Sequence, residues 1–286
     1  MDTLSLVAAN RLVDNPDCAA ALEMTVVGPR LRFLNSAIFS LTGADLSARL
    51  DEGHLSPGKP YRAAPNQILS FGKRKNGMYA YLGIMGGFDT PLVLDSRSTY
   101  LYAGFGGLNG RALLATDILW RFKRDKRGIP SLGALPAPLL LPRDGLRHVR
   151  VILGPNEERF SRKGMDTFFE SEYEVTTASN RMGYRLDGPK IEHSSGPIIV
   201  SESTPAGAIQ VPGQGTPVVL LRERGTTGGY TKIACTITPD IDLIAQVVPG
   251  GKMRFGAVSL AEAHEIDRHR WAALDAWKKP VYEPAS

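Results

Sequence analysis

The chain has 286 residues, of which 43% are hydrophobic and 22% are charged, and its formal net charge is +5. This length and apolar content suffice for one large or two smaller folded domains, and they exclude wholesale disorder. The basic residues are scattered, apart from a run at 121–127 that we interpret as a solvated linker. A nucleic-acid-binding function is therefore not indicated, and no apolar run is long enough to span a membrane.

Thirty glycines, twenty prolines and short apolar runs favour strands and turns over long helices. In chain order, Asn15 and Pro16 predict the start of a short helix that continues to Leu22. The strands predicted next are Met24–Val27, Leu31–Leu34, Gln67–Phe71, Met78–Ile84, Leu92–Leu94 and Ile118–Phe122. Their close spacing favours antiparallel or barrel-like pairing.

A segment rich in glycine and proline follows, and we place a domain boundary there. The predicted organisation is a β-barrel domain over 1–125, a linker over 126–147 and a second β-barrel domain over 148–286. Strands of the second domain are predicted at His148–Leu153, Tyr173–Thr177, Ile198–Val200, Val218–Leu221, Lys232–Ile237 and Met253–Phe255. The fold class is thus mainly β, with a few short helices.

The C-terminal region predicts a helix. Ser259 and Glu262 have the spacing of a capping box, in which two side chains satisfy free backbone N–H groups. One helical face then carries Ile266, Arg270, Ala273, Leu274 and Trp277.

Several common site signatures are absent. His264 and His269 are five residues apart and point to different sides of a helix, so no metal site is predicted. The segment Gly104–Asn109 lacks the third glycine of a dinucleotide fingerprint, and there is no P-loop. The two cysteines, Cys18 and Cys235, form no disulfide framework, so we expect a cytoplasmic location.

Four glycine-containing segments carry candidate site residues. In the first, Arg97 can bind a carboxylate or phosphate, with Ser98 and Thr99 as further donors. An arginine that satisfies turn carbonyls explains this segment equally well. In the second, Arg181 can bind an anion or can pair with an acidic neighbour. In the third, Gln210 offers an acceptor and two donors, which suits an amide or ureido group; the alternative is a glutamine that ends a strand.

The fourth segment, Thr226–Lys232, is the most specific. Consecutive glycines Gly228 and Gly229 allow backbone N–H groups to converge on an anion. Thr226 and Thr227 add hydroxyl groups, and Tyr230 and Lys232 can supply a proton or positive charge from one face of a strand. A tight hairpin is the alternative.

The chain resembles the C subunit of bacterial 5-oxoprolinase, a family also described as biotin-dependent carboxyltransferase or allophanate hydrolase subunit 2. It is also similar to part of the urea amidolyase carboxyltransferase domain. The residues that carry the resemblance are Ala9–Val13, Ala20–Glu23, Gly43–Asp45, Ser96–Tyr100, Arg181–Gly183, Gly207–Pro212 and Thr226–Tyr230.

The resemblance implies a fold of two cyclophilin-like β-barrels. It also implies a tight partner similar to the 5-oxoprolinase B subunit, which is also called allophanate hydrolase subunit 1. A protein similar to the A subunit is the third component that the resemblance suggests. It implies a hydrolase, active only in that complex, which opens the cyclic amide 5-oxoproline to glutamate with ATP bound by a partner protein. Two alternatives stay open: a biotin-dependent carboxyltransferase acting on urea or a related amide, with biotin on another chain, and a non-catalytic antagonist of a kinase inhibitor.

On this interpretation the site residues form two groups. We expect the catalytic group to stabilise negative charge and move protons; it comprises Thr226, Thr227, Gly228, Gly229, Tyr230 and Lys232. We expect the other group to bind and orient the substrate; it comprises Arg97, Ser98, Thr99, Arg181, Gln210 and Glu223.

Overall fold

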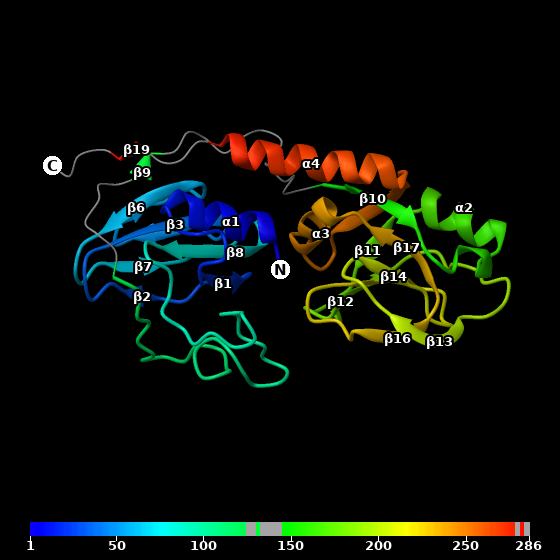
Figure 1. Cartoon of the computed structure of the whole chain (residues 1–286), viewed down its shortest axis with the longest axis horizontal. Coiled ribbons are helices and arrows are strands. Elements are labelled where there is room, and N and C mark those ends of the chain that lie inside the picture. The colour runs from blue at the N-terminus through cyan, green and yellow to red at the C-terminus, as the bar shows by residue number, and fades with distance from the viewer. Residues whose placement is uncertain (124–129, 132–144, 278–280, 283–286) are drawn as a thin grey trace. The chain divides into compact units, whose positions relative to one another are not determined.

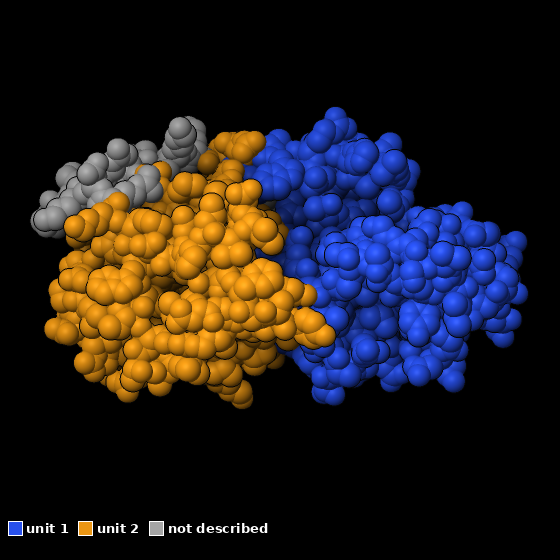
Figure 2. Space-filling view, turned by 60° about the horizontal axis from the view of Figure 1, so that its bottom comes forward, with its two compact units in different colours: residues 1–2, 140–274 blue, residues 3–139, 275–286 orange. Residues whose placement is uncertain are grey.

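The computed structural model describes residues 1–123, 130–131, 145–277 and 281–282. The chain divides into two compact units, shown in different colours in Figure 2. Unit 1 comprises Met1–Asp2 and Leu140–Leu274, and unit 2 comprises Thr3–Leu139 and Asp275–Ser286. The linker predicted over 126–147 lies mostly outside the described residues.

Unit 2 contains two four-stranded sheets (Figure 1). The first has the order β1-β8-β3-β6, and its strands are Leu22–Thr25, Asn76–Ile84, Ala37–Asp45 and Lys59–Ala63. The second has the order β2-β7-β4-β5, with strands Leu31–Arg32, Ile68–Ser70, Arg49–Leu50 and Gly53–His54. A short pair, β9 (Pro130–Ser131) with β19 (Val281–Tyr282), completes the unit.

Helix α1 (Thr3–Leu12) packs on β3 and β8 of the first sheet. Two strand hydroxyls donate to its carbonyl oxygens: Ser40 Oγ to Ala9 at 2.6 Å and Thr42 Oγ1 to Ser5 at 2.7 Å. A Cβ atom at Gly83 would lie 2.7 Å from the Ala9 carbonyl oxygen, so this glycine allows the close approach. The helix expected between Asn15 and Leu22 is wrong, because this stretch forms turns and then β1.

Residues 86–122 of unit 2 are irregular. The strands predicted at 92–94 and 118–122 do not form, and only isolated bridges such as Phe88↔Arg121 occur there. Six glycines of this segment have positive φ, a conformation that strands do not use: Gly86, Gly87, Gly104, Gly106, Gly107 and Gly110. The glycine turns of this segment therefore replace the regular strands that its apolar side chains favour.

Unit 1 is built on a closed seven-stranded barrel with the order β10-β17-β14-β15-β12-β11-β18. In that order the strands are Arg147–Leu153, Lys232–Thr236, Ala208–Gln210, Val218–Leu220, Gly183–Asp187, Tyr173–Val175 and Lys252–Ala257. Parallel pairing of β10 with β18 closes it. The mainly β fold class is confirmed, and the barrel fits the expected cyclophilin-like fold.

Beside the barrel, strands β13 (Ile198–Ser203) and β16 (Thr227–Tyr230) form a separate two-stranded sheet. The helical elements of unit 1 are η2 (Glu157–Arg159), α2 (Arg162–Glu170), α3 (Thr238–Ala245) and α4 (Leu260–Ala276). The predicted capping box of α4 is present: Ser259 N–H donates to Glu262 Oε2 at 2.7 Å, and Glu262 N–H donates to Ser259 Oγ at 3.2 Å. None of the described helices is both long and apolar enough to cross a membrane.

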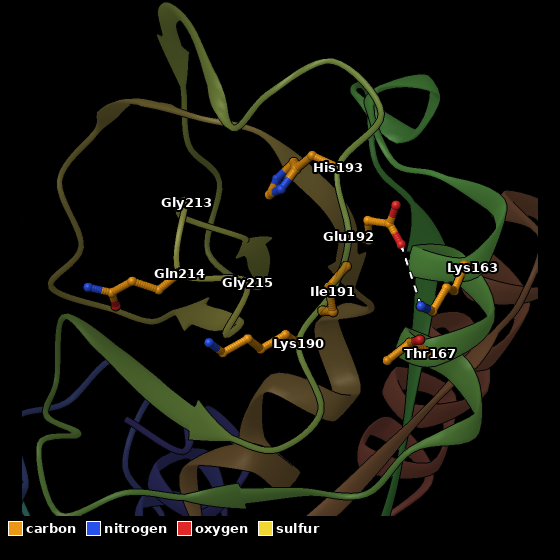
Figure 3. A pocket seen from close by; sticks show the side chains of 9 residues that line it. All are labelled: Lys163, Thr167, Lys190, Ile191, Glu192, His193, Gly213, Gln214 and Gly215. Atoms are coloured by element: carbon orange, nitrogen blue, oxygen red, sulfur yellow. Dashed lines mark ion pairs between the residues drawn. The ribbon is translucent and has the colours of Figure 1, made fainter.

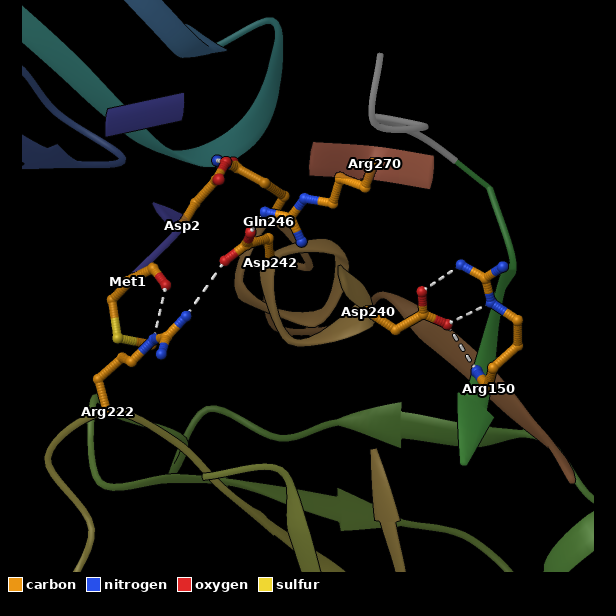
Figure 4. A network of polar contacts seen from close by, with 8 residues as sticks. All are labelled: Met1, Asp2, Arg150, Arg222, Asp240, Asp242, Gln246 and Arg270. Carbon is orange, nitrogen blue, oxygen red and sulfur yellow. Dashed lines mark hydrogen bonds and ion pairs between the residues drawn. The ribbon is translucent and has the colours of Figure 1, made fainter. Parts of the chain in front are cut away.

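Ion pairs to buried carboxylates fix α3 and α4 within unit 1 (Figure 4). On α3, Asp240 accepts from the Arg150 guanidinium at 2.6 and 3.0 Å. Asp242 is 1% exposed. Its Oδ2 accepts a hydrogen bond from Arg270 Nη2 of α4, and its Oδ1 lies 3.4 Å from Arg222 Nη2. Arg270 therefore turns inward from α4 because it pairs with a buried carboxylate.

Candidate functional site

The predicted site residues fall into both units, with Arg97, Ser98 and Thr99 in unit 2 and the others in unit 1. In unit 2, the Arg97 guanidinium contacts residues of the same irregular segment, 86–122. Its Nη1 donates to the Thr90 carbonyl, and its Cζ lies 4.9 Å from the centre of the Phe122 ring. The Ser98 N–H donates to Ser96 Oγ at 3.2 Å. These contacts match the structural alternative for this segment, an arginine that satisfies a turn carbonyl.

Arg181 and Glu223 are bound to each other. Arg181 Nε lies 2.5 Å from Glu223 Oε1, and the Glu223 N–H donates to the Arg181 carbonyl at 3.0 Å. The Glu223 side chain is only 14% exposed. The structure thus brings these two predicted substrate-binding residues together as an ion pair, the second interpretation given above for Arg181.

The glycine segment adopts an extended conformation. Residues Thr227–Tyr230 form β16 and pair with β13, and the Thr204 N–H donates to the Thr226 carbonyl at 3.0 Å. Neither Gly228 nor Gly229 has positive φ. Successive N–H groups of an extended strand alternate in direction. The converging nest expected over 226–229 is therefore not formed.

The chain passes from one sheet to another at Thr231. Tyr230 ends β16 and is 44% exposed, whereas Lys232 begins β17 of the barrel and is 3% exposed. The expectation that both side chains share one strand face does not hold, because they belong to different sheets. Lys232 lies inside the unit and Tyr230 lies on its surface.

Lys232 pairs with a carboxylate that the sequence did not suggest. Its Nζ lies 2.5 Å from Glu202 Oε1 of β13. Hydrogen bonding to Lys232 lowers the pKa of Glu202, and Asn156 contributes a second hydrogen bond. Asn156 Oδ1 also accepts the Lys232 backbone N–H at 2.9 Å. Glu202 is 41% exposed, so the ion pair extends from the buried Lys232 ammonium group to the surface of the unit.

Gln210 lies next to this pair. A bulge places Gln210 of β14 opposite Lys232 of β17, and bulges of this kind re-aim side chains near functional sites. Gln210 is 8% exposed, and its Nε2 has no hydrogen-bond partner in the described chain. A Cβ at Gly228 would lie 2.6 Å from that Nε2. The Gln210 side-chain amide therefore occupies the space that a side chain at position 228 would fill.

We call Asn156, Glu202, Gln210, Gly228 and Lys232 the lysine cluster. It combines an unused amide donor, a buried ammonium group and a carboxylate within one unit. A buried donor without a partner is unfavourable by about 1–3 kcal/mol, so the Gln210 amide is available to an acceptor such as a ligand carbonyl. Among the described residues, no group of three or more histidines, cysteines or carboxylates is arranged to hold a metal ion.

Residues 1–257 match the carboxyltransferase domain, subdomains A and B, and the chain belongs to this family. It is 36% identical to the 5-oxoprolinase C subunit of Escherichia coli over 282 residues, which cover 97% of this chain and 88% of the relative. It is also 36% identical to the 5-oxoprolinase C subunit of Haemophilus influenzae over 283 residues, covering 99% and 89%. The family resemblance inferred from the motifs is confirmed.

Among solved structures, the urea carboxylase of Kluyveromyces lactis is similar with a TM-score of 0.90 and 28% identity. The match covers 100% of this chain and 27% of that chain. The fold of the whole chain is thus that of one part of a larger carboxylase.

Proposed function

We propose that the chain is one component of an ATP-dependent 5-oxoprolinase-type amidohydrolase. In this reaction water adds to the lactam carbonyl of 5-oxoproline, the C–N bond breaks, and the nitrogen takes up a proton to give glutamate. The similarity to two 5-oxoprolinase C subunits over nearly the whole chain supports the substrate class. The single structural observation that carries the proposal is the buried, unused amide donor of Gln210 beside Lys232.

The lysine cluster supplies the chemistry that a lactam requires. Gln210 Nε2 donates to the carbonyl oxygen, and the Lys232 ammonium group stabilises the negative charge that collects there. Such fixed charges and donors stabilise a transition state most strongly where water is excluded. Glu202 and Asn156 position Lys232 and act through it.

The proposed site is shared with partner proteins. Proteins similar to the B and A subunits of 5-oxoprolinase complete the complex, and one of these partners binds ATP. The expected substrate-binding residues Arg97, Ser98 and Thr99 belong to unit 2 and stay outside the proposed site, because Arg97 is occupied by Thr90 and Phe122. Tyr230, which is exposed, is proposed as a proton donor in the same assembly.

Co-expression of this chain with its proposed partners tests the proposal. The purified complex is assayed for glutamate formed from 5-oxoproline, with and without ATP. We expect ATP-dependent glutamate that disappears when this chain is left out. A stable complex that turns over neither lactam nor urea would favour the non-catalytic alternative, an antagonist of a kinase inhibitor.

A second candidate is a carboxyltransferase component that acts on urea or a related amide, with biotin carried by another chain. The similarity of the entire fold to urea carboxylase favours it. The lysine cluster suits this reaction too, because urea also presents a planar carbonyl between nitrogen atoms. Urea-dependent ATP hydrolysis that avidin blocks, without glutamate release, would select this candidate.

A further inference from the structure

A cavity of about 360 Å³ lies in unit 1, separate from the lysine cluster (Figure 3). Helix α2, the segment 190–193 and the loop 213–215 surround it. Its lining residues are Lys163, Thr167, Lys190, Ile191, Glu192, His193, Gly213, Gln214 and Gly215. The volume is at the lower end of the range for small-molecule sites.

The walls of the cavity are held by contacts that need no ligand. The Ile191 N–H donates to the Gly215 carbonyl at 2.9 Å, which ties the 190–193 segment to the loop. On the other side, the Ser161 N–H donates to the Glu192 carbonyl at 3.1 Å. The rings of Phe160 and His193 lie 4.6 Å apart. The cavity is therefore formed in advance, which reduces the free energy spent on ordering when a ligand binds.

The cavity has an uncompensated positive charge on the side that faces the loop. Glu192 turns away from this side toward Lys163, whose Nζ lies 3.9 Å from Glu192 Oε2 (Figure 3). Lys190 points toward the loop and makes no ion pair within the described residues. Burial lowers the pKa of His193, which favours the neutral ring and contacts through hydrogen bonds.

His193 links the cavity to the start of β17. Its Nε2 lies 3.0 Å from Thr231 Oγ1, and Thr231 directly precedes Lys232. A ligand that contacts His193 therefore perturbs the environment of Thr231.

We propose that this cavity binds a small doubly charged anion, a phosphate or a dicarboxylate. Lys190 supplies the charge, and Lys163 and Thr167 supply further donors from helix α2. Two charges are required of the ligand because a single exposed lysine holds a singly charged ion only weakly.

The test uses the full chain labelled with ¹⁵N at constant ionic strength. Inorganic phosphate and glutarate are titrated separately, with sodium chloride as the control salt, while the signals of the His193 ring and the Thr231 amide are followed. We expect saturable shifts with at least one dianion and none with chloride. Lys190→Gln should weaken binding at least about fivefold.

Lys59→Gln is the matched control, since Lys59 is an exposed lysine of unit 2 with no ion pair among the described residues. It should leave the affinity unchanged. Thermal unfolding of both variants confirms that they are folded, as expected for exposed side chains. Shifts that fail to saturate with both dianions, or equal weakening by both variants, would overturn the proposal.

Discussion

Lys232 and Glu202 form an ion pair of 2.5 Å between a barrel strand and the neighbouring two-stranded sheet. The ammonium group is buried and the carboxylate is partly exposed, so the pair links the interior of unit 1 to its surface. Burial removes much of the hydration energy of an ammonium group, and the contact with the Glu202 carboxylate offsets this cost.

Glu202 should titrate below the ordinary range of a glutamate. Hydrogen bonding to Lys232 lowers its pKa, so the associated stabilisation is present above the unfolded-state pKa and is lost as the pH falls through the folded-state pKa. A ¹³C carboxyl NMR titration measures this value directly. In Lys232→Met the pKa of Glu202 should rise toward the ordinary value of a glutamate. A titration curve that is the same in both proteins would show that the pair does not form in solution.

Gln210→Met should separate stability from function. The substitution removes an unpartnered buried N–H₂ group while it keeps the side-chain volume. We expect the free energy of unfolding, measured in urea, to stay the same or to rise by up to about 1 kcal/mol. The KM for the amide substrate should rise at least tenfold in the assembled complex. A clear loss of stability would mean that Gln210 has a structural partner instead.

Gly228→Ala should displace the Gln210 amide, because the new Cβ would approach its Nε2 to 2.6 Å and Thr204 Cγ2 to 3.1 Å. The amide is the end of a flexible side chain, so the unfolding free energy should fall by no more than about 1 kcal/mol while activity falls strongly. Gly256→Ala is the control, since a Cβ at this strand glycine meets nothing within 4 Å. Equal activity of the two variants would exclude a role for the Gln210–Gly228 contact.

Asp242→Asn should destabilise unit 1. The buried Asp242 carboxylate accepts a hydrogen bond from Arg270 and forms an ion pair with Arg222. Loss of the carboxylate charge therefore leaves the buried Arg270 guanidinium without this compensation. We expect a loss of about 3 kcal/mol in the free energy of unfolding. Asp275→Asn, at a carboxylate that is 75% exposed, should change it by less than about 1 kcal/mol. Similar values for both variants would contradict a structural role for this ion pair.

Much of the fold could be predicted from local patterns. Strands such as β8, β10 and β17 follow apolar runs, and α4 follows its capping box. Helix α1 was missed although Leu4, Val7, Ala8 and Leu12 have helical spacing, because Ser5, Ala9 and Asn10 are buried too and no polar face marks the helix. Only the sheet beneath it, through Ser40 and Thr42, reveals why it is a helix.

The candidate site could be predicted only in part. Gln210 and Lys232 were identified from their chemistry, but their proximity depends on a bulge that the sequence does not show. Glu202 and Asn156 were missed because their contacts with Lys232 join segments distant along the chain. The glycines at 228 and 229 were interpreted as an anion nest, yet Gly228 provides room for a neighbouring amide.

The most direct test of the account is the activity of Lys232→Met in the complex assembled with its partner proteins. Lys252→Met is the matched control, since Lys252 is a strand lysine of the same barrel with an exposed ion pair at 3.8 Å. We predict that Lys232→Met lowers ATP-dependent glutamate release from 5-oxoproline at least about a hundredfold while the complex stays intact, and that Lys252→Met has little effect. Full turnover by the Lys232→Met complex would contradict the proposed site.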